Sequence, residues 1–190
     1  MIRTSILRTS IQWALPIACA TLALVAQAAD GDINLPKSSI VATIRQENVP
    51  VEATFKSFSG TIVYDAAKPA ATSAAVTIEV SSLDMGDESY NAEVRKAAWF
   101  DSSHFPQATF RSTAVKAGAA GHIDATGILT IKGKMQTVTV PISVQRVGDA
   151  TSFDGSLEVS RKVFGIGDPS WDDVLDDKVQ VRFHLQGAGS

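Results

Sequence analysis

The segment from Ile123 to Val144 constrains the fold of this chain most strongly. Apolar side chains occupy alternate positions in its two halves: Ile123, Ala125, Leu129 and Ile131, then Val138, Val140, Ile142 and Val144. Because successive side chains of a strand point to opposite faces, each half has one apolar and one polar face. Lys132-Gly133-Lys134 lies between the halves and can turn the chain. The segment therefore predicts a β-hairpin with one apolar side.

The same alternation recurs through most of the chain and predicts about eight strands. Turn signals such as Lys68-Pro69 and Ala117-Gly118 separate them, and Ser59-Gly60 marks a bend within one of them. A helix is expected over Glu88–Ala98, with Asp87 or Ser89 as its cap. The expected strands cover residues 39–46, 51–64, 74–83, 108–116, 122–132, 137–145, 152–161 and 178–185.

This pattern predicts an all-β fold, an eight-stranded antiparallel barrel or sandwich with one short helix. A closed barrel leaves no exposed edge strand, and at eight strands its interior holds side chains or one small ligand. Pro141 has no N–H to contribute to a strand ladder, so it should mark a bulge or a gap in the wall. No linker divides the chain, which predicts a single domain over residues 29–190.

Residues 1–28 resemble an export signal. Arg3 and Arg8 supply the positive end, Ile11–Val25 the apolar stretch, and Ala26-Gln27-Ala28 an A-x-A cleavage site. A membrane anchor is the alternative, although the apolar run is short and contains Pro16. We expect cleavage near Ala28 and a periplasmic protein.

Cys19 is the only cysteine of the chain and lies within the apolar stretch. Residues 29–190 therefore offer no disulfide, thiol nucleophile or cysteine metal ligand. A lipidated Cys19 is the alternative to cleavage near Ala28, but Pro16-Ile17-Ala18 fits a lipoprotein signal poorly. Without Arg3 and Arg8 the formal net charge falls from -3 to about -5. The remaining Lys and Arg form no cluster, so nucleic acid is not an expected partner.

Four segments of the chain carry a resemblance to a known family. One is Trp99–Thr113, which reads W-F-D-S-S-H-F-P-Q-A-T-F-R-S-T. The other three are Phe55–Ile62 with Tyr64-Asp65, Thr126–Gly133, and Arg161 with Phe164–Gly167. Together they resemble the YceI-like family of exported lipid-binding proteins, and the last three follow the order that the family has. Each segment alone has low specificity, but the ordered set covers nearly all of residues 29–190.

The resemblance implies a lipocalin-like barrel with an elongated apolar cavity that holds a long isoprenoid or other amphiphilic lipid, quinone-type molecules included. Asp168-Pro169-Ser170-Trp171 resembles the branch of the family found beside b-type membrane cytochromes. This implies a membrane redox partner, although the chain contains no such membrane domain. The oligomeric state stays open, with a dimer among the alternatives.

Residues that alternate correctly and lie on different strands are the candidate cavity contacts. Ordinary core packing is the alternative for each of them, since an empty barrel also needs apolar side chains at its ends. The candidates are Phe55, Phe110, Leu129, Val140, Ile142, Phe153, Leu157, Val181 and Phe183. Among Ala108, Phe110, Ser112 and Ala114, which are expected to share one face, Phe110 is the only large residue.

The sequence assigns no catalytic residue, metal site or cofactor beyond the bound lipid. His104, His122 and His184 show no metal-ligand spacing, and His184 should point away from the apolar face. The aspartates near residues 84–87 and 168–177 are interpreted as loop charges and helix caps. No G-x-S-x-G nucleophile motif is present. The expected function is lipid binding, sequestration or transport without catalysis. An accessory module for a membrane cytochrome and a lipid-acting enzyme are the alternatives.

Overall fold

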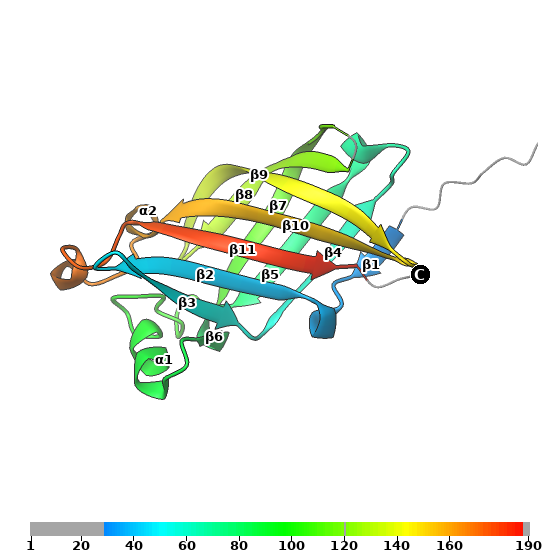
Figure 1. Cartoon of the computed structure of the whole chain (residues 1–190). Helices are drawn as coiled ribbons and strands as arrows, with labels where there is room; N and C mark the ends of the chain where they lie inside the picture. Colours follow the sequence, from blue (N-terminus) through cyan, green and yellow to red (C-terminus); the bar gives the residue numbers. More distant parts are fainter. Residues whose placement is uncertain (1–28, 120, 188–190) are drawn as a thin grey trace, which may run out of the picture.

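The computed structural model describes residues 29–119 and 121–187. They form one antiparallel sheet of eleven strands, in the order β1-β4-β5-β7-β8-β9-β10-β11-β2-β3-β6. The sheet curls around an apolar interior, and the few helices are short and lie at its ends and edges (Figure 1). The all-β prediction is confirmed. The expected signal peptide and Cys19 lie outside the described residues.

The strands and helices have the following bounds. The strands are β1 Ala29–Asp32, β2 Ser39–Gln46, β3 Val49–Phe55, β4 Phe58–Tyr64, β5 Ser73–Glu79, β6 Leu83–Asp84, β7 Gln107–Ala117, β8 His122–Ile131, β9 Lys134–Val147, β10 Ala150–Ser160 and β11 Lys178–Gln186. The α-helices are α1 Glu88–Val94 and α2 Arg161–Phe164. The 3-10 turns are η1 Leu35–Lys37, η2 Pro69–Ala71, η3 Val80–Ser82 and η4 Pro169–Trp171.

The expected count of eight strands is not what the structure has, for three local reasons. The long strand predicted over 51–64 is interrupted at residues 56–57, not at Ser59-Gly60, and forms β3 and β4. The strand predicted over 74–83 ends at Glu79, where η3 turns the chain into β6. The short β1 pairs with β4 and was not predicted. Alternation of apolar residues continues across these interruptions between strands, so the alternation alone does not reveal them.

The hairpin predicted around Lys132 is confirmed as β8 and β9. Lys132 and Gly133 form its two-residue turn with φ of 47° and 72°. Two consecutive positive φ angles match the twist of the flanking strands, and glycine adopts them without strain. Ala125 stands opposite Val140 and Ile123 opposite Ile142, so the apolar residues of both strands share the inner face.

A bulge in β7 changes which of its side chains face inward. The register with β8 shifts between Ser112 and Ala114. Beyond this point Val115 is buried and Ala114 is exposed. The prediction that Ala114 shares a face with Phe110 is therefore wrong, because one extra residue reverses the alternation that follows it.

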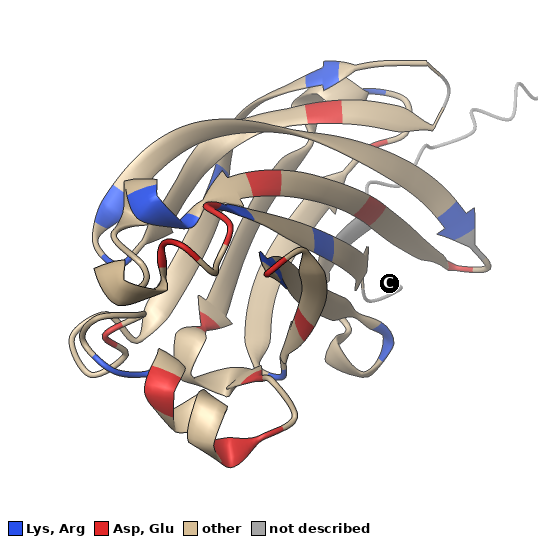
Figure 2. Ribbon diagram, turned by 60° about the vertical axis from the view of Figure 1, so that its left-hand side comes forward, with Lys and Arg blue, Asp and Glu red and all other residues tan. Residues whose placement is uncertain are grey.

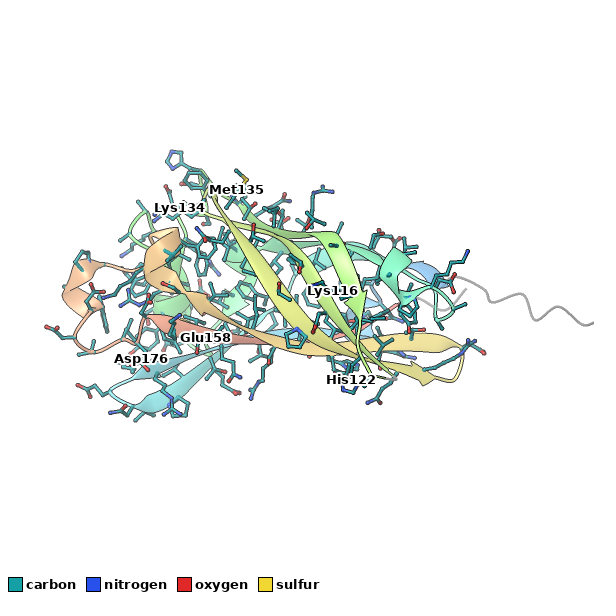
Figure 3. All side chains as sticks on the ribbon, turned by 90° about the horizontal axis from the view of Figure 1, so that it is seen from above. Lys116, His122, Lys134, Met135, Glu158 and Asp176 are labelled. Carbon is teal, nitrogen blue, oxygen red and sulfur yellow. The ribbon has the colours of Figure 1, made fainter. Side chains whose placement is uncertain are left out.

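The wall of the sheet opens beside Pro141, as predicted. The pairing of β9 with β10 ends at Ile142 and Gly155. Over the described residues, none of positions 134–141 of β9 is paired with positions 156–160 of β10. We call this unpaired stretch the seam. Figure 3 shows the two strands diverging from the His122 end toward Lys134 on β9 and Glu158 on β10.

Aspartates cap α1 and η4, as the sequence analysis expects, whereas the Ser160 hydroxyl caps α2. Oδ1 of Asp87 accepts from the backbone N–H of Ser89 at 2.8 Å at the start of α1. This helix ends at Val94, shorter than predicted, because the chain then turns through residues 95–102. Asp168 accepts from the N–H of Ser170 at 2.8 Å at the start of η4. Each carboxylate satisfies an otherwise unpaired backbone donor.

Candidate ligand cavity

The curled sheet encloses an apolar cavity of about 200 Å³. Every strand from β2 to β11, except β6, contributes side chains to its wall. Thr72 and Arg161 are the polar residues of the wall, and the surface that they present to the cavity is carbon. Such a wall offers van der Waals contact and exclusion of water but no hydrogen bond. The cavity therefore suits a hydrocarbon chain, whose polar group would lie elsewhere.

The residues predicted as cavity contacts all lie on this wall: Phe55, Phe110, Leu129, Val140, Ile142, Phe153, Leu157, Val181 and Phe183. Phe55, Val140 and Phe153 are buried. The other predicted positions are only partly buried and keep part of their surface open. That these side chains contact a ligand stays a prediction.

Phe110 owes its position to a glycine on the neighbouring strand. A Cβ atom built on Gly127 of β8 would lie 2.6 Å from two carbons of the Phe110 ring and would also collide with the carbonyl of Arg111. Only glycine leaves room for the ring at this place. Phe110 thus packs across β8 and forms part of the cavity wall beside Leu129, which stands opposite it in the register.

Sequence reasoning missed several wall residues. Val115 faces the cavity because of the bulge in β7. Phe100 and Ile166 reach the cavity from irregular segments at the α2 end of the curled sheet, where no alternation predicts the direction of a side chain. The signal that could have identified Phe100 and Ile166 is the family resemblance of the segments around residues 99–113 and 161–167.

Arg161 organises the segment that closes the α2 end of the cavity. We call residues 161–177 the cap. The Arg161 side chain is 3% exposed. Its Nε donates to the carbonyl of Asp176 at 3.0 Å, and Nη1 to the carbonyl of Ile166 at 3.2 Å. Its Nη2 donates to Oδ1 of Asp172 at 2.8 Å and to the carbonyl of Leu175 at 3.1 Å. One guanidinium thus holds both ends of the cap.

Two lysines of the β8–β9 hairpin tie the cap to the rest of the barrel. Nζ of Lys132 donates to the carbonyls of Ala97 and Gly165 at 2.7 and 2.8 Å. Nζ of Lys134 donates to the carbonyl of Val163 at 3.2 Å. Burial lowers the pKa of Lys132, and the nearby carboxylate of Asp101 opposes this effect. The lysines join β9 to the cap across the outer end of the seam.

Carboxylates of the cap have lowered pKa values. Hydrogen bonds from Lys162 and Arg161 lower the pKa of Asp172 below its ordinary value of 3.8. The Ser170 hydroxyl and N–H lower the pKa of Asp168. Burial raises the pKa of Asp177, but hydrogen bonds from the Lys162 N–H and the Ser160 hydroxyl outweigh it and leave the value lowered. The cap is therefore held by ionised carboxylates.

We expect the cap to weaken in acid. A carboxylate with a lowered folded-state pKa stabilises the protein fully above its unfolded-state pKa, near 3.8 for Asp172, and loses this effect as the pH falls through the folded-state value. Protection of the cap amides from hydrogen exchange, taken relative to the intrinsic exchange rate at each pH, should therefore fall below pH 3.8 more than protection of the β7–β8 ladder. Asp172→Asn should show a smaller acid effect, and an unchanged acid effect in that variant would contradict the role of Asp172.

Other polar groups lie on the outer surface. His184 points away from the cavity, as predicted, and its Nδ1 lies 2.6 Å from Oδ1 of Asp154. Nδ1 of His104 lies 2.8 Å from Oδ1 of Asp101.

Among the described residues, no three His, Cys, Asp or Glu side chains are grouped to hold a metal ion. In Figure 2 the positive and negative residues are interspersed over strands and loops. No helix within residues 29–119 and 121–187 is both long and apolar enough to span a bilayer.

Known proteins share this sequence and architecture. A YceI-like domain model matches residues 32–187. The crystal structure of BcnA from Burkholderia cenocepacia is 44% identical with a TM-score of 0.80, over 82% of this chain and 99% of that protein. Protein YceI of Salmonella arizonae is 38% identical over 119 residues, which span 60% of this chain and 62% of that relative.

A more distant neighbour shares the fold. The polyisoprenoid-binding domain from Saccharophagus degradans, implicated in plant cell wall breakdown, is 16% identical with a TM-score of 0.66, over 86% of this chain and 100% of that domain. The family resemblance inferred from the four sequence segments is confirmed by the domain match, which covers most of the chain. The chain belongs to the YceI-like family.

Proposed function

We propose that this protein binds the hydrocarbon part of a long-chain isoprenoid or of another amphiphilic lipid, a quinone-type molecule included. The observation that carries the proposal is the cavity inside the curled sheet, whose wall presents only carbon to its contents. The neighbouring domain from Saccharophagus degradans, described as polyisoprenoid-binding, supports the isoprenoid class.

Burial of the chain would supply the affinity. Each CH₂ group removed from water contributes about 0.8 kcal/mol. Association costs at least about 4 kcal/mol in lost freedom of motion, so about the first five buried groups only offset this cost. Each further pair of buried groups contributes about 1.6 kcal/mol and tightens binding somewhat more than tenfold. Longer chains would bind more tightly as long as the cavity and its openings accept them.

We propose binding or transport, and not catalysis. General acid–base chemistry requires a titratable group within hydrogen-bond reach of the reacting atoms. The cavity wall presents only carbon to its contents, and the guanidinium of Arg161 is engaged with carbonyls and Asp172. Sequestration of an insoluble chain from water needs nothing more than this wall.

We also propose that the protein is exported, is cleaved near Ala28 and acts in the periplasm. Arg3, Arg8, the apolar stretch and the A-x-A site at residues 26–28 support this. A second function, docking to a membrane b-type cytochrome, rests on Trp171, which is 36% exposed and lies between Asp168 and Asp172, the aspartates that flank η4. The ring of Trp171 already packs edge-to-face on Trp99, with 6.3 Å between the ring centroids.

Native mass spectrometry of protein purified from its native host tests both proposals. The expected mass is that of residues 29–190 plus one long-chain compound per subunit, and the same spectrum reports the number of subunits. Organic extraction should release the compound for identification. Protein refolded after extraction is the control, and it should melt at a lower temperature than the loaded form because a ligand stabilises the folded state that binds it.

Two results would contradict these proposals separately. A chain that begins at a diacylated Cys19 would exclude the proposed cleavage site. Stoichiometric zinc or iron without any lipid would exclude binding of a long-chain compound as the function.

A further inference from the structure

A groove of about 610 Å³, lined by apolar as well as polar side chains, lies on the outside of the curled sheet, over β8–β11 and β2. Its floor is a row of polar residues that stand directly opposite one another on neighbouring strands: His122, Ser143, Asp154, His184 and Ser39. Imidazoles, hydroxyls and a carboxylate therefore share one hollow of the surface. We call it the outer groove.

Fixed charges in the outer groove are paired. His184 is hydrogen-bonded to Asp154, and Arg182 forms an ion pair with Glu52 on β3. An added phosphate would meet the Asp154 carboxylate and a guanidinium that is already engaged. An uncharged head group with hydroxyl or carbonyl oxygens would instead exchange hydrogen bonds with the imidazoles and hydroxyls.

The outer groove begins where the wall opens. Pro141 and Ser156 line the groove and are the first positions of the seam. Their neighbours Val140 and Leu157 line the cavity. Adjacent residues of a strand face opposite sides of the sheet. At this place, therefore, neighbouring residues line the groove on the outside and the cavity on the inside. Figure 3 shows the two strands apart at Lys134 on β9 and Glu158 on β10.

We propose that the outer groove binds the head group of the lipid and that the seam is the opening through which its tail enters the cavity. This deepens the proposed function and rests on it. The cavity wall offers no polar surface, so the head group lies outside, and the groove is a hydrogen-bonding site one residue away from an unpaired part of the wall. The head group is of the uncharged, oxygen-bearing class, as in a polyprenol or an isoprenoid quinone.

Ligands that differ only in their head group test the groove. The probes are geranylgeraniol, an isoprenoid quinone, geranylgeranyl diphosphate and squalene, which has no head group. In Ser143→Ala with His184→Ala, affinity for the alcohol and the quinone should fall about tenfold, because two hydrogen bonds are lost, while affinity for squalene stays the same. His104→Ala is the matched control, since this exposed histidine also binds an aspartate through Nδ1 but lies far from the groove in the sequence and lines neither hollow.

Different results would contradict lipid binding itself and the head-group site in the outer groove. If the native sequence binds neither squalene nor the head-bearing probes, the proposed function itself fails. If it binds them and the double variant weakens squalene as much as the alcohol, the head group does not lie in the groove. Tighter binding of the diphosphate than of the alcohol would overturn the uncharged class.

Cross-linking tests the seam. Thr139 and Glu158 point outward and would face each other if the β9–β10 ladder continued past Pro141. In Thr139→Cys with Glu158→Cys, a short bifunctional thiol reagent should slow release of a bound probe at least about tenfold, since the strands can no longer part. The control is Thr126→Cys with Thr139→Cys, because Oγ1 atoms of these residues already lie 2.9 Å apart across the intact β8–β9 ladder. Equal release rates for the two cross-linked proteins would overturn the seam as the entry route.

Discussion

Arg161→Met is expected to destabilise the protein by about 3–5 kcal/mol. The substitution keeps an unbranched chain of similar length against the cavity but removes the donors for the carbonyls of Ile166, Leu175 and Asp176. Buried acceptors without partners each cost about 1–3 kcal/mol, and Asp172 loses its buried partner as well. Urea unfolding, compared at the transition midpoint with an unchanged m-value, measures the loss.

Lys162→Met is the matched control for Arg161. Lys162 follows it directly and binds the same Asp172 at 3.0 Å, but its side chain is 48% exposed. An exposed ion pair contributes at most about 1 kcal/mol, so this variant should unfold almost like the native sequence. Arg161→Lys should restore little, because an ammonium group lacks the forked donors that reach several carbonyls at once. Equal destabilisation by Arg161→Met and Lys162→Met would show that the buried network adds nothing beyond the surface charge of the cap.

Phe110→Trp is expected to weaken ligand binding about tenfold to a hundredfold while the fold survives. The Phe110 ring lies on the cavity wall and is only partly buried, so a larger ring extends into the open space. Displacing two to four CH₂ groups of a ligand removes about 1.6–3 kcal/mol of binding free energy. Titration with an extracted or synthetic isoprenoid and the melting temperature of the same sample measure both effects.

Phe58→Trp provides the contrast. Phe58 is 4% exposed and does not line the cavity, so a larger ring there overpacks solid core and should cost about 1–3 kcal/mol of stability. Its ligand affinity, measured well below the melting temperature, should stay near that of the native sequence. If Phe110→Trp instead melts early and binds normally once folded, Phe110 belongs to the core and not to the binding site.

Local sequence pattern was sufficient for the parts of this molecule that depend on one strand at a time. Alternation identified the apolar face along the regular parts of the predicted strands, and the predicted cavity residues all lie on the cavity wall, because side-chain direction along a regular strand follows from the pleat alone. Lys132-Gly133 was recognisable as a turn from the conformational freedom of glycine, and Pro141 as a gap from its missing N–H.

Contacts between distant segments decided the rest. The bulge that turns Val115 inward depends on how β7 meets β8, and neither strand shows it in isolation. Arg161 appeared only as one residue of a family motif, because three of its four partners are the backbone carbonyls of Ile166, Leu175 and Asp176, which carry no sequence signal. The outer groove joins residues from five strands whose register is set by pairing across the whole sheet. Sequence patterns report the direction of a side chain, whereas its neighbours across the sheet follow from the register that the folded chain adopts.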